Sequence, residues 1–358
     1  MKIELIGDPK VVMSNPLGKH GYFGWPSAAR LKNGKIAIGA SGFRLTHICP
    51  FGKAVVAFSD DDGETYTPPM AVIDTVLDDR DAGLTPFGES GLIVSSFNNT
   101  IEFQRKECQA HKTYCNAYLD TITLEQQNKV LGSTFRVSFD NGVTYGELYH
   151  APVSSPHGPF ELKNGKILYV GRPYDVSTGD FIRAYTLDPY TGKCEFVGEI
   201  EAVYDGEKKL ISCEPHTMEL DDGTLLCQIR VQDREGKFFT IYQSESTDEG
   251  KTWTKPHQIL SDKGGAPSHV FKHSSGTLVS CYGYREFPYG VRVMFSNDNG
   301  KTWDTDNTLY ENEVSGDLGY PETVELPDGS MITIFYARPA KGAPAVVFQQ
   351  KWRFSPEA

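Results

Sequence analysis

Long apolar runs, excess basic charge and a leader-like start are all missing from this sequence of 358 residues. No apolar run approaches the roughly 18 residues of a membrane span, so we expect no contact with a membrane. The net charge of −12 argues against nucleic acid as a partner. The start, MKIELIGDPKVV, has no basic segment followed by an apolar one, so no signal peptide is predicted. We expect a cytoplasmic protein, or a secreted or periplasmic one if a signal has been removed.

Cysteine is scarce, and its pattern does not indicate a disulfide framework. The seven cysteines are an odd number. Cys213, Cys227 and Cys281 lie in or beside apolar strand runs, as buried thiols do. Cys108 and Cys115 are the only close pair, and their spacing lacks the partner ligands of a zinc site. The pattern predicts a reducing compartment, or at most one disulfide.

The sequence does contain a repeat. Glycines lead into short apolar strands at positions 34, 91, 165, 223, 276 and 329, at intervals of 53 to 74 residues. Asn-Gly or Asp-Gly at 33–34, 164–165, 222–223 and 328–329 is the turn chemistry of a tight β-hairpin. Four short antiparallel strands in each of six units predict an all-β, six-bladed β-propeller of four-stranded blades. The six units use nearly the whole chain, so we expect a single domain over residues 1–358.

A second motif, S-x-D-x-G-x-T-[YW], occurs in four of the units. It reads SDDDGETY from Ser59, SFDNGVTY from Ser138, STDEGKTW from Ser246 and SNDNGKTW from Ser296. The Asp side chain can close a turn on backbone N–H groups, Gly supplies a positive φ, and the aromatic ring packs into the blade. We interpret these boxes as structural staples on the face away from any pocket.

These boxes resemble the Asp-box (BNR) repeats of the sialidase superfamily, and of bacterial exo-sialidases in particular. The six-bladed fold of that superfamily agrees with the unit count, and the resemblance extends over essentially the whole chain. The resemblance implies a glycoside hydrolase that acts on an acidic sugar and needs no cofactor.

Two segments stand outside the repeat. Residues 1–13 alternate in hydrophobicity and predict a strand that completes the blade formed by Ala345–Phe354. About residues 98–133 interrupt the second unit with a Gln-, Glu-, Lys- and Leu-rich stretch, which predicts a helical insertion. It lies at the same end of its unit as the arginines described next. A lid or pocket wall and a decorative surface insertion are both open interpretations.

Arginines close the second strand of five units. They are Arg44, Arg172, Arg230, Arg285 and Arg338. Equivalent strand ends converge on the axis of a propeller, and gathered guanidinium groups suit a carboxylate, sulfate or phosphate. Ion pairs between blades are the alternative for any single arginine. For Arg230 and Arg285 together, we favour a bound anion.

The resemblance assigns roles to four residues. Glu214 and Tyr320 resemble the family's paired base and nucleophile, in which the glutamate takes the phenolic proton as the tyrosine attacks the anomeric carbon. Arg230 and Arg285 resemble two of its three substrate-carboxylate arginines. The structural alternative for Tyr320 is an ordinary aromatic of an inner strand.

The sequence departs from the family at two points. The family's first arginine lies two residues before a proline, where this chain has Gly24 before Pro26, so Arg44 is the candidate to replace it. The loop GFRLTHICPFG lacks the family's acid/base aspartate, which leaves His47 as its only proton-transfer group. Asp81, which matches a pocket aspartate of the family, is the other candidate acid.

Three histidines open units three, four and five at similar places: His157, His216 and His269. They could polarise a sugar, act as a lyase base or bind a metal, and we predict no metal because nothing fixes ligand spacing across blades.

The leading hypothesis is an exo-acting hydrolase that releases sialic acid or a related acidic sugar with retention. A lyase or glycosidase for another anionic sugar and a non-catalytic carbohydrate-binding propeller are the alternatives.

Overall fold

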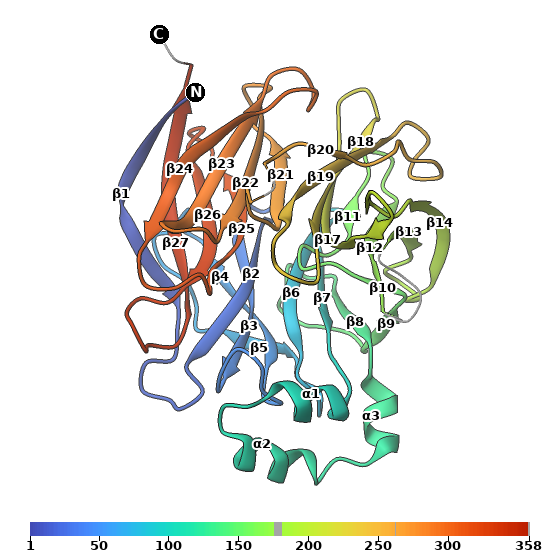
Figure 1. Cartoon of the computed structure of the whole chain (residues 1–358), viewed down its shortest axis with the longest axis vertical. Coiled ribbons are helices and arrows are strands. Elements are labelled where there is room, and N and C mark those ends of the chain that lie inside the picture. The colour runs from blue at the N-terminus through green and yellow to red at the C-terminus, as the bar shows by residue number, and fades with distance from the viewer. Residues whose placement is uncertain (175–180, 262, 357–358) are drawn as a thin grey trace.

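The computed structural model describes residues 1–174, 181–261 and 263–356, and these form a six-bladed β-propeller (Figure 1). Blade 1 is β2 (Tyr22–Arg30), β3 (Ile36–Arg44), β4 (Lys53–Ser59) and β5 (Met70–Ile73). Blade 2 is β6 (Arg80–Phe87), β7 (Gly91–Phe97), β8 (Ser133–Ser138) and β9 (Tyr149–Ala151). Blade 3 is β10 (Val153–Ser154) with β11 (Phe160–Glu161), β12 (Ile167–Pro173), β13 (Ile182–Leu187) and β14 (Cys194–Ile200).

The other three blades repeat the plan. Blade 4 is β17 (Ile211–Glu219), β18 (Leu225–Gln232), β19 (Phe239–Ser246) and β20 (His257–Gln258). Blade 5 is β21 (Ser268–Lys272), β22 (Leu278–Tyr284), β23 (Tyr289–Ser296) and β24 (Asp304–Asn312). Blade 6 is β25 (Gly319–Glu325), β26 (Met331–Ala337), β27 (Val346–Ser355) and β1 (Lys2–Met13). A separate hairpin, β15 (Tyr204–Asp205) and β16 (Lys208–Lys209), precedes blade 4.

The N-terminal strand closes the ring, as the sequence predicts. β1 pairs antiparallel with β27, with Ile3 opposite Phe354 and Leu5 opposite Trp352. Figure 1 shows the two ends of the chain side by side. The Trp352 side chain is fully buried, in a cluster that blade 6 shares with blade 5. Adjacent blades are therefore joined by apolar contacts that sequence-distant strands supply together.

The predicted hairpin turns join the first two strands of their blades. Gly223 has φ of 87°, and its N–H donates to the Leu220 carbonyl at 3.0 Å. Only glycine adopts this conformation without strain, which explains the Asp-Gly dipeptide.

The Asp-boxes close the turns after β4, β8, β19 and β23. In the box after β23, Ser296 Oγ accepts from Gly300 N–H, and Asp298 accepts from the Thr302 N–H and hydroxyl at 2.9 and 2.6 Å. Ser296 pairs with Leu278, the first residue of β22, whereas Arg285 follows the last residue. The boxes therefore lie at the opposite end of the blades from the arginines, as predicted.

The insertion between β7 and β8 contains three helices, α1 (Ile101–Glu107), α2 (Lys112–Leu119) and α3 (Leu124–Val130). Thr123 caps α3 with a capping box that involves Gln126. The insertion packs on blade 1, where the Tyr118 hydroxyl donates to the Val76 carbonyl at 3.2 Å. Three cysteines that form no disulfide, Cys49, Cys108 and Cys115, pack together at this contact. Among the helices described, none has the length and apolar character to cross a membrane.

Candidate active site

Four residues with the same unusual backbone lie on the inner strands of blades 1, 2, 4 and 6. Trp25, Asp81, Glu214 and Tyr320 have φ of 51°, 60°, 49° and 50°. Each is the first residue of a β-bulge, where two residues oppose one on the neighbouring strand. A bulge redirects its side chain, and a positive φ costs a non-glycine residue about 1–3 kcal/mol. The propeller thus maintains a strained backbone at the positions from which side chains turn toward its axis.

Tyr320, Glu214 and Arg230 form one hydrogen-bonded group. The Tyr320 hydroxyl donates to Glu214 Oε1 at 2.6 Å. Arg230 Nη1 donates to Glu214 Oε2 at 2.6 Å and to the Tyr320 hydroxyl at 3.2 Å. The predicted tyrosine–glutamate pair and Arg230, one of the two arginines predicted to bind an anion, are therefore in contact across blades 4 and 6.

The charges of this group match its geometry. Burial raises the pKa of Glu214, but Arg230, the Tyr320 hydrogen bond and Arg285 together hold the pKa of this carboxyl below its usual range. Burial and the Glu214 charge raise the pKa of Tyr320 well above 10, although Arg230 and Arg285 oppose this. Tyr320 is therefore a protonated phenol held against an ionised carboxylate, which is the arrangement needed for a base to take the phenolic proton.

Arg285 covers the other side of the phenol. Its guanidinium carbon lies 5.9 Å from the centre of the Tyr320 ring and 5.6 Å from that of Phe239, and its Nε donates to the Leu318 carbonyl at 3.3 Å. Among the described residues, none hydrogen-bonds to either of its terminal nitrogens. Arg230 Nε and Nη2 both donate to Gln232 Oε1.

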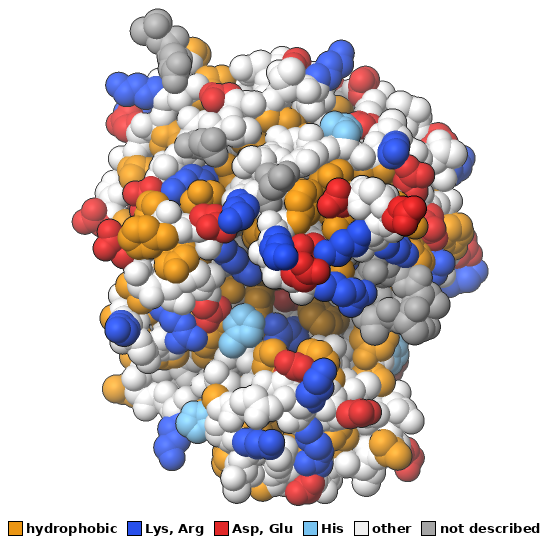
Figure 2. Space-filling view, in the orientation of Figure 1, with side chains coloured by type: hydrophobic (Ala, Val, Ile, Leu, Met, Phe, Trp, Pro, Cys, Tyr) orange, Lys and Arg blue, Asp and Glu red, His pale blue; other side chains and the backbone are white. Residues whose placement is uncertain are grey.

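A cavity of about 620 Å³ opens beside this group. Asp81, Arg172, Glu214, Arg230 and Gln232 supply polar groups to its wall. Thr100, Phe103 and Leu131 of the insertion and its flanks line the same cavity, so the insertion is a pocket wall. Figure 2 shows that the surface is hollowed between the blades and the insertion, with basic and histidine side chains at the hollow.

Asp81 is an acid suited to this cavity. The residue is buried, at 7 % exposure. Burial raises the pKa of Asp81 to about 7, with Arg80 opposing and Glu214 adding to the effect. A large fraction of this carboxyl therefore carries a proton near neutral pH.

The chain belongs to the BNR repeat-like domain family. The family model matches residues 135–334. No curated protein matches the sequence closely enough to count as a relative.

Several solved structures resemble this BNR repeat-like domain. A protein of unknown function from Dyadobacter fermentans is 19 % identical with a TM-score of 0.77, and the match covers 99 % of each chain. The Trypanosoma rangeli sialidase in complex with the inhibitor DANA is 16 % identical with a TM-score of 0.64, over 93 % of this chain and 55 % of that one. The intramolecular trans-sialidase from Ruminococcus gnavus is 12 % identical with a TM-score of 0.61, over 94 % and 96 %. This chain thus spans about half the length of the Trypanosoma enzyme, and at these identities the likeness establishes the fold alone.

Arg44 does not replace the missing arginine of blade 1. Its side chain is fully buried and donates from both terminal nitrogens to Asp78, at 2.6 and 2.9 Å. Arg44 and Arg80 lie 4.8 and 4.0 Å from the Trp25 ring centre. Both terminal nitrogens of Arg44 are therefore committed to a buried carboxylate, and Arg44 is not in the wall of the cavity beside Glu214.

The three histidines converge, but they are not in the wall of the cavity. The rings of His157, His216 and His269 lie 4.3 to 5.7 Å apart, beside the buried carboxyl of Glu322. His216 Nδ1 accepts from Val270 N–H and His269 Nδ1 from Thr323 N–H, so each neutral ring carries its proton on Nε2.

Burial lowers the pKa of each of these histidines well below its usual value, so all three are neutral. With Nδ1 committed to a backbone donor and Nε2 protonated, His216 and His269 cannot ligate a metal through either nitrogen. Nowhere in the described ranges do three His, Cys, Asp or Glu form a group that could hold a metal ion. The predicted contact of these histidines with substrate does not agree with their place in the core.

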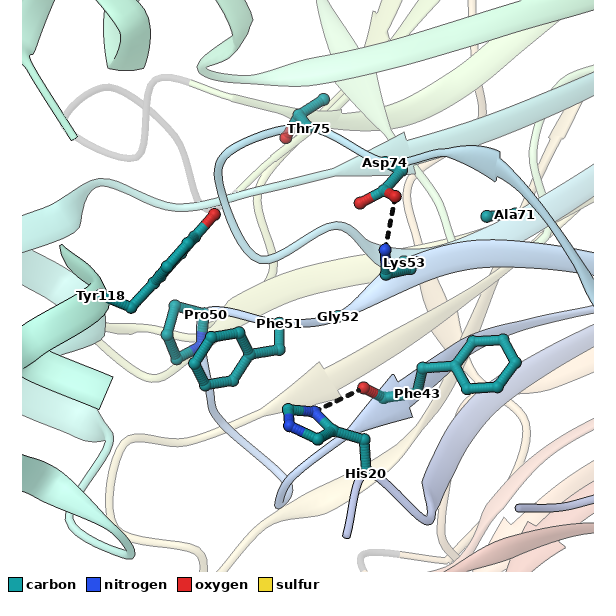
Figure 3. Close-up of a pocket in the computed structure, with 10 residues that line it drawn as sticks. All are labelled: His20, Phe43, Pro50, Phe51, Gly52, Lys53, Ala71, Asp74, Thr75 and Tyr118. Carbon is teal, nitrogen blue, oxygen red and sulfur yellow. Dashed lines mark hydrogen bonds and ion pairs between the residues drawn. The ribbon is translucent and has the colours of Figure 1, made fainter. Parts of the chain in front are cut away.

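A second cavity, of about 560 Å³, lies between blade 1 and α2 (Figure 3). His20, Phe51 and Tyr118 supply aromatic surface, and its two charged side chains, Lys53 and Asp74, pair with each other. It contains none of the predicted site residues, and its charges are balanced, so the cavity beside Glu214 remains the candidate site.

Proposed function

We propose that this protein is an exo-acting glycoside hydrolase of sialidase type that releases sialic acid or a related terminal acidic sugar with retention. The observation that carries the proposal is the contact of the Tyr320 hydroxyl with both Glu214 and Arg230, at 2.6 and 3.2 Å. Solved sialidases share the fold, and one is described with an inhibitor and another as an intramolecular trans-sialidase, which supports the proposal by analogy.

Arg230 and Arg285 are the groups that would hold the substrate carboxylate. In this structure the Gln232 amide oxygen occupies the fork formed by Arg230 Nε and Nη2. A carboxylate fits the same fork with two charge-assisted hydrogen bonds, so it would displace an amide that binds less strongly. Arg172 lies in the wall of the same cavity and would extend the positive surface.

In the first half-reaction, Tyr320 attacks the anomeric carbon while Glu214 takes the phenolic proton. The bond to the leaving oxygen breaks, and Asp81 donates its proton to that oxygen. A phenol is suited to this task because a carboxylate nucleophile would be repelled by the anionic sugar, and sialidases are the known exception to the two-carboxylate rule. Of the two candidate acids, Asp81 is favoured because its pKa of about 7 keeps a proton available. Burial instead lowers the pKa of His47, which leaves that ring neutral.

A lyase or glycosidase for another anionic sugar is the second candidate. The observation that favours it is the inner strand of blade 1, where Gly24 occupies the family's arginine position and Arg44 is buried against Asp78. The site therefore has fewer arginines than the three that hold the substrate carboxylate in the family. A sugar whose carboxylate has another orientation would fit such a site as well as sialic acid.

The test is release of the aryl group from a sialic acid aryl glycoside, with the product's anomeric form followed by NMR. We expect turnover with retained configuration. Because Asp81 acts in its protonated form, kcat/KM on a sialylated disaccharide, which reports the first half-reaction, should fall as pH rises above about 7. Asp81→Asn should lower turnover of the disaccharide far more than that of the aryl glycoside, whose leaving group needs little protonation.

Three other results would count against the proposal. An unsaturated product absorbing in the ultraviolet would identify a lyase. Turnover confined to uronic acid glycosides would replace the substrate class. Binding of acidic glycans without any turnover would identify a carbohydrate-binding propeller.

A further inference from the structure

His47 and Asp317 form a hydrogen-bonded pair at the junction of blades 1 and 6. His47 Nδ1 lies 3.0 Å from Asp317 Oδ1 and 2.9 Å from the Tyr22 hydroxyl. The Tyr22 hydroxyl donates its only proton to the same Asp317 oxygen at 2.9 Å. The Tyr336 hydroxyl also donates to Asp317, at 3.2 Å, and Arg338 donates from Nε and Nη2 to its second oxygen.

These donors fix the protonation state of Asp317. Burial raises the pKa of Asp317, but the hydrogen bond and charge of His47, the Tyr22 hydrogen bond and the Arg338 charge outweigh it and lower the pKa of this carboxyl far below its usual value. An ionised oxygen 3.0 Å from an unprotonated ring nitrogen would place two lone pairs against each other. The neutral His47 ring therefore carries its proton on Nδ1, and Nε2 presents a lone pair.

The His47 side chain is partly open to solvent. The His47 side chain is 44 % exposed, whereas that of Asp317 is 18 % exposed. Within the part of the chain that the structure describes, no hydrogen bond is made by His47 Nε2. The ring lies edge-on to Trp25 at 4.9 Å, and Trp25 shares a buried aromatic cluster with Tyr320 and Tyr336. The pair therefore lies beside the aromatic cluster that contains Tyr320.

We propose that Asp317 is a positioning residue that holds His47 with Nε2 as a proton acceptor, and that His47 is the base that activates water in the second half-reaction. The role in turnover rests on the proposed function, whereas the positioning does not. Water gives a proton to Nε2 as its oxygen bonds to the anomeric carbon. The bond from that carbon to the Tyr320 oxygen breaks, and the phenolate recovers its proton from Glu214. The His47 imidazolium then loses its proton to solvent, from which Asp81 is reprotonated.

The surroundings keep His47 in its basic form. Burial lowers the pKa of His47, Arg80 and Arg44 lower it further, and only Asp317 acts in the opposite direction. Tyr22 and Trp25 supply the remaining contacts and carry no charge at neutral pH. A base that is neutral at pH 7 can take a proton, and it is lost as pH falls through its pKa.

The first test measures the tautomer directly and does not depend on turnover. Protein labelled with ¹⁵N at its nine histidines gives long-range ¹H–¹⁵N spectra, and His47→Gln identifies the His47 signals by their loss. We expect protonated Nδ1 and unprotonated Nε2 in the wild type at pH 7.5. Asp317→Asn should raise the share of the Nε2-protonated form and move the titration midpoint of His47 to lower pH. A wild-type ring protonated on Nε2 would overturn the proposal.

The second test separates a base from a structural residue. On a sialic acid aryl glycoside, His47→Gln should release one equivalent of aryl group rapidly and then turn over about 100-fold more slowly than the wild type. Azide needs no base, so it should restore turnover and yield the glycosyl azide. Asp81→Asn is the matched variant for the same azide experiment. If azide restores turnover of Asp81→Asn but not of His47→Gln, then Asp81 rather than His47 activates the water, and the proposal is wrong.

The two ways of failing are distinct. If the wild type turns over no acidic glycoside, the proposed function and the water-activation step fail together, and the tautomer still decides whether Asp317 positions His47.

Discussion

Tyr320→Phe is expected to lower kcat/KM on an acidic glycoside by about 1,000-fold or more, since removal of a nucleophile leaves only binding and electrostatic stabilisation. The substitution deletes the hydroxyl that bonds Glu214 and Arg230 and keeps the ring, whose centre lies 6.0 Å from that of Tyr336. Arg230 continues to pair with Glu214, so the substrate carboxylate should still bind. Steady-state kinetics should show a fall in kcat with little change in KM.

Tyr66→Phe is the matched control. Tyr66 belongs to the Asp-box of blade 1, at the far end of the blades, and its partly buried hydroxyl donates to Gln349 of β27 at 2.7 Å. The activity of the variant should equal that of the wild type. If both variants lose activity alike, or neither does, Tyr320 is not the nucleophile.

Arg44→Met is expected to lower the free energy of unfolding by about 3–5 kcal/mol, the usual cost of leaving a buried charge without its partner. The Arg44 and Asp78 side chains are 0 % and 2 % exposed, and Arg80 lies 3.6 Å from Asp78, too far to replace both hydrogen bonds. Urea denaturation of both proteins gives the difference.

The control for this prediction is an ion pair at the surface. Arg353 and Glu4 join β27 to β1, and their side chains are 59 % and 58 % exposed. Arg353→Met should leave the denaturation midpoint unchanged, because water solvates both charges in the folded and unfolded states. Equal denaturation midpoints for Arg44→Met and Arg353→Met would contradict the prediction, because they would show that the buried ion pair contributes no more to stability than the exposed one.

The sequence was sufficient to predict the propeller because each unit carries local chemistry that only one arrangement satisfies. The Asp-Gly turns require a positive φ, the Asp-boxes close turns on backbone donors, and the unpaired N-terminal strand needs a partner. The family resemblance also predicted the pairing of Glu214 with Tyr320, whose side chains are hydrogen-bonded in the structure.

The side chains that surround the pair were harder to predict. Arginine at a strand end is compatible with a pocket or with the interface between blades, and only the position of Asp78 decides this for Arg44. The buried tautomers of the histidines depend on backbone N–H groups of neighbouring blades, which the sequence does not reveal.

The sequence also contains a signal for the site that our sequence analysis did not use. Trp25, Glu214 and Tyr320 are each followed by proline, at Pro26, Pro215 and Pro321. Proline cannot donate to a sheet ladder, so an aligned X-Pro in several inner strands marks a bulge and hence a redirected side chain. Asp317 had no comparable signal, because its partners come from blade 1 and from the end of β26 in blade 6.

The most direct test of the account is to trap the glycosyl enzyme. A fluorinated sialic acid with an activated leaving group forms its bond to the nucleophile normally and hydrolyses slowly, so intact mass spectrometry detects the adduct and peptide mapping locates it. We predict one adduct per chain, on the peptide that contains Tyr320, and none on Tyr320→Phe. An adduct on another residue, or turnover of the sugar with no adduct at all, would contradict the central claim.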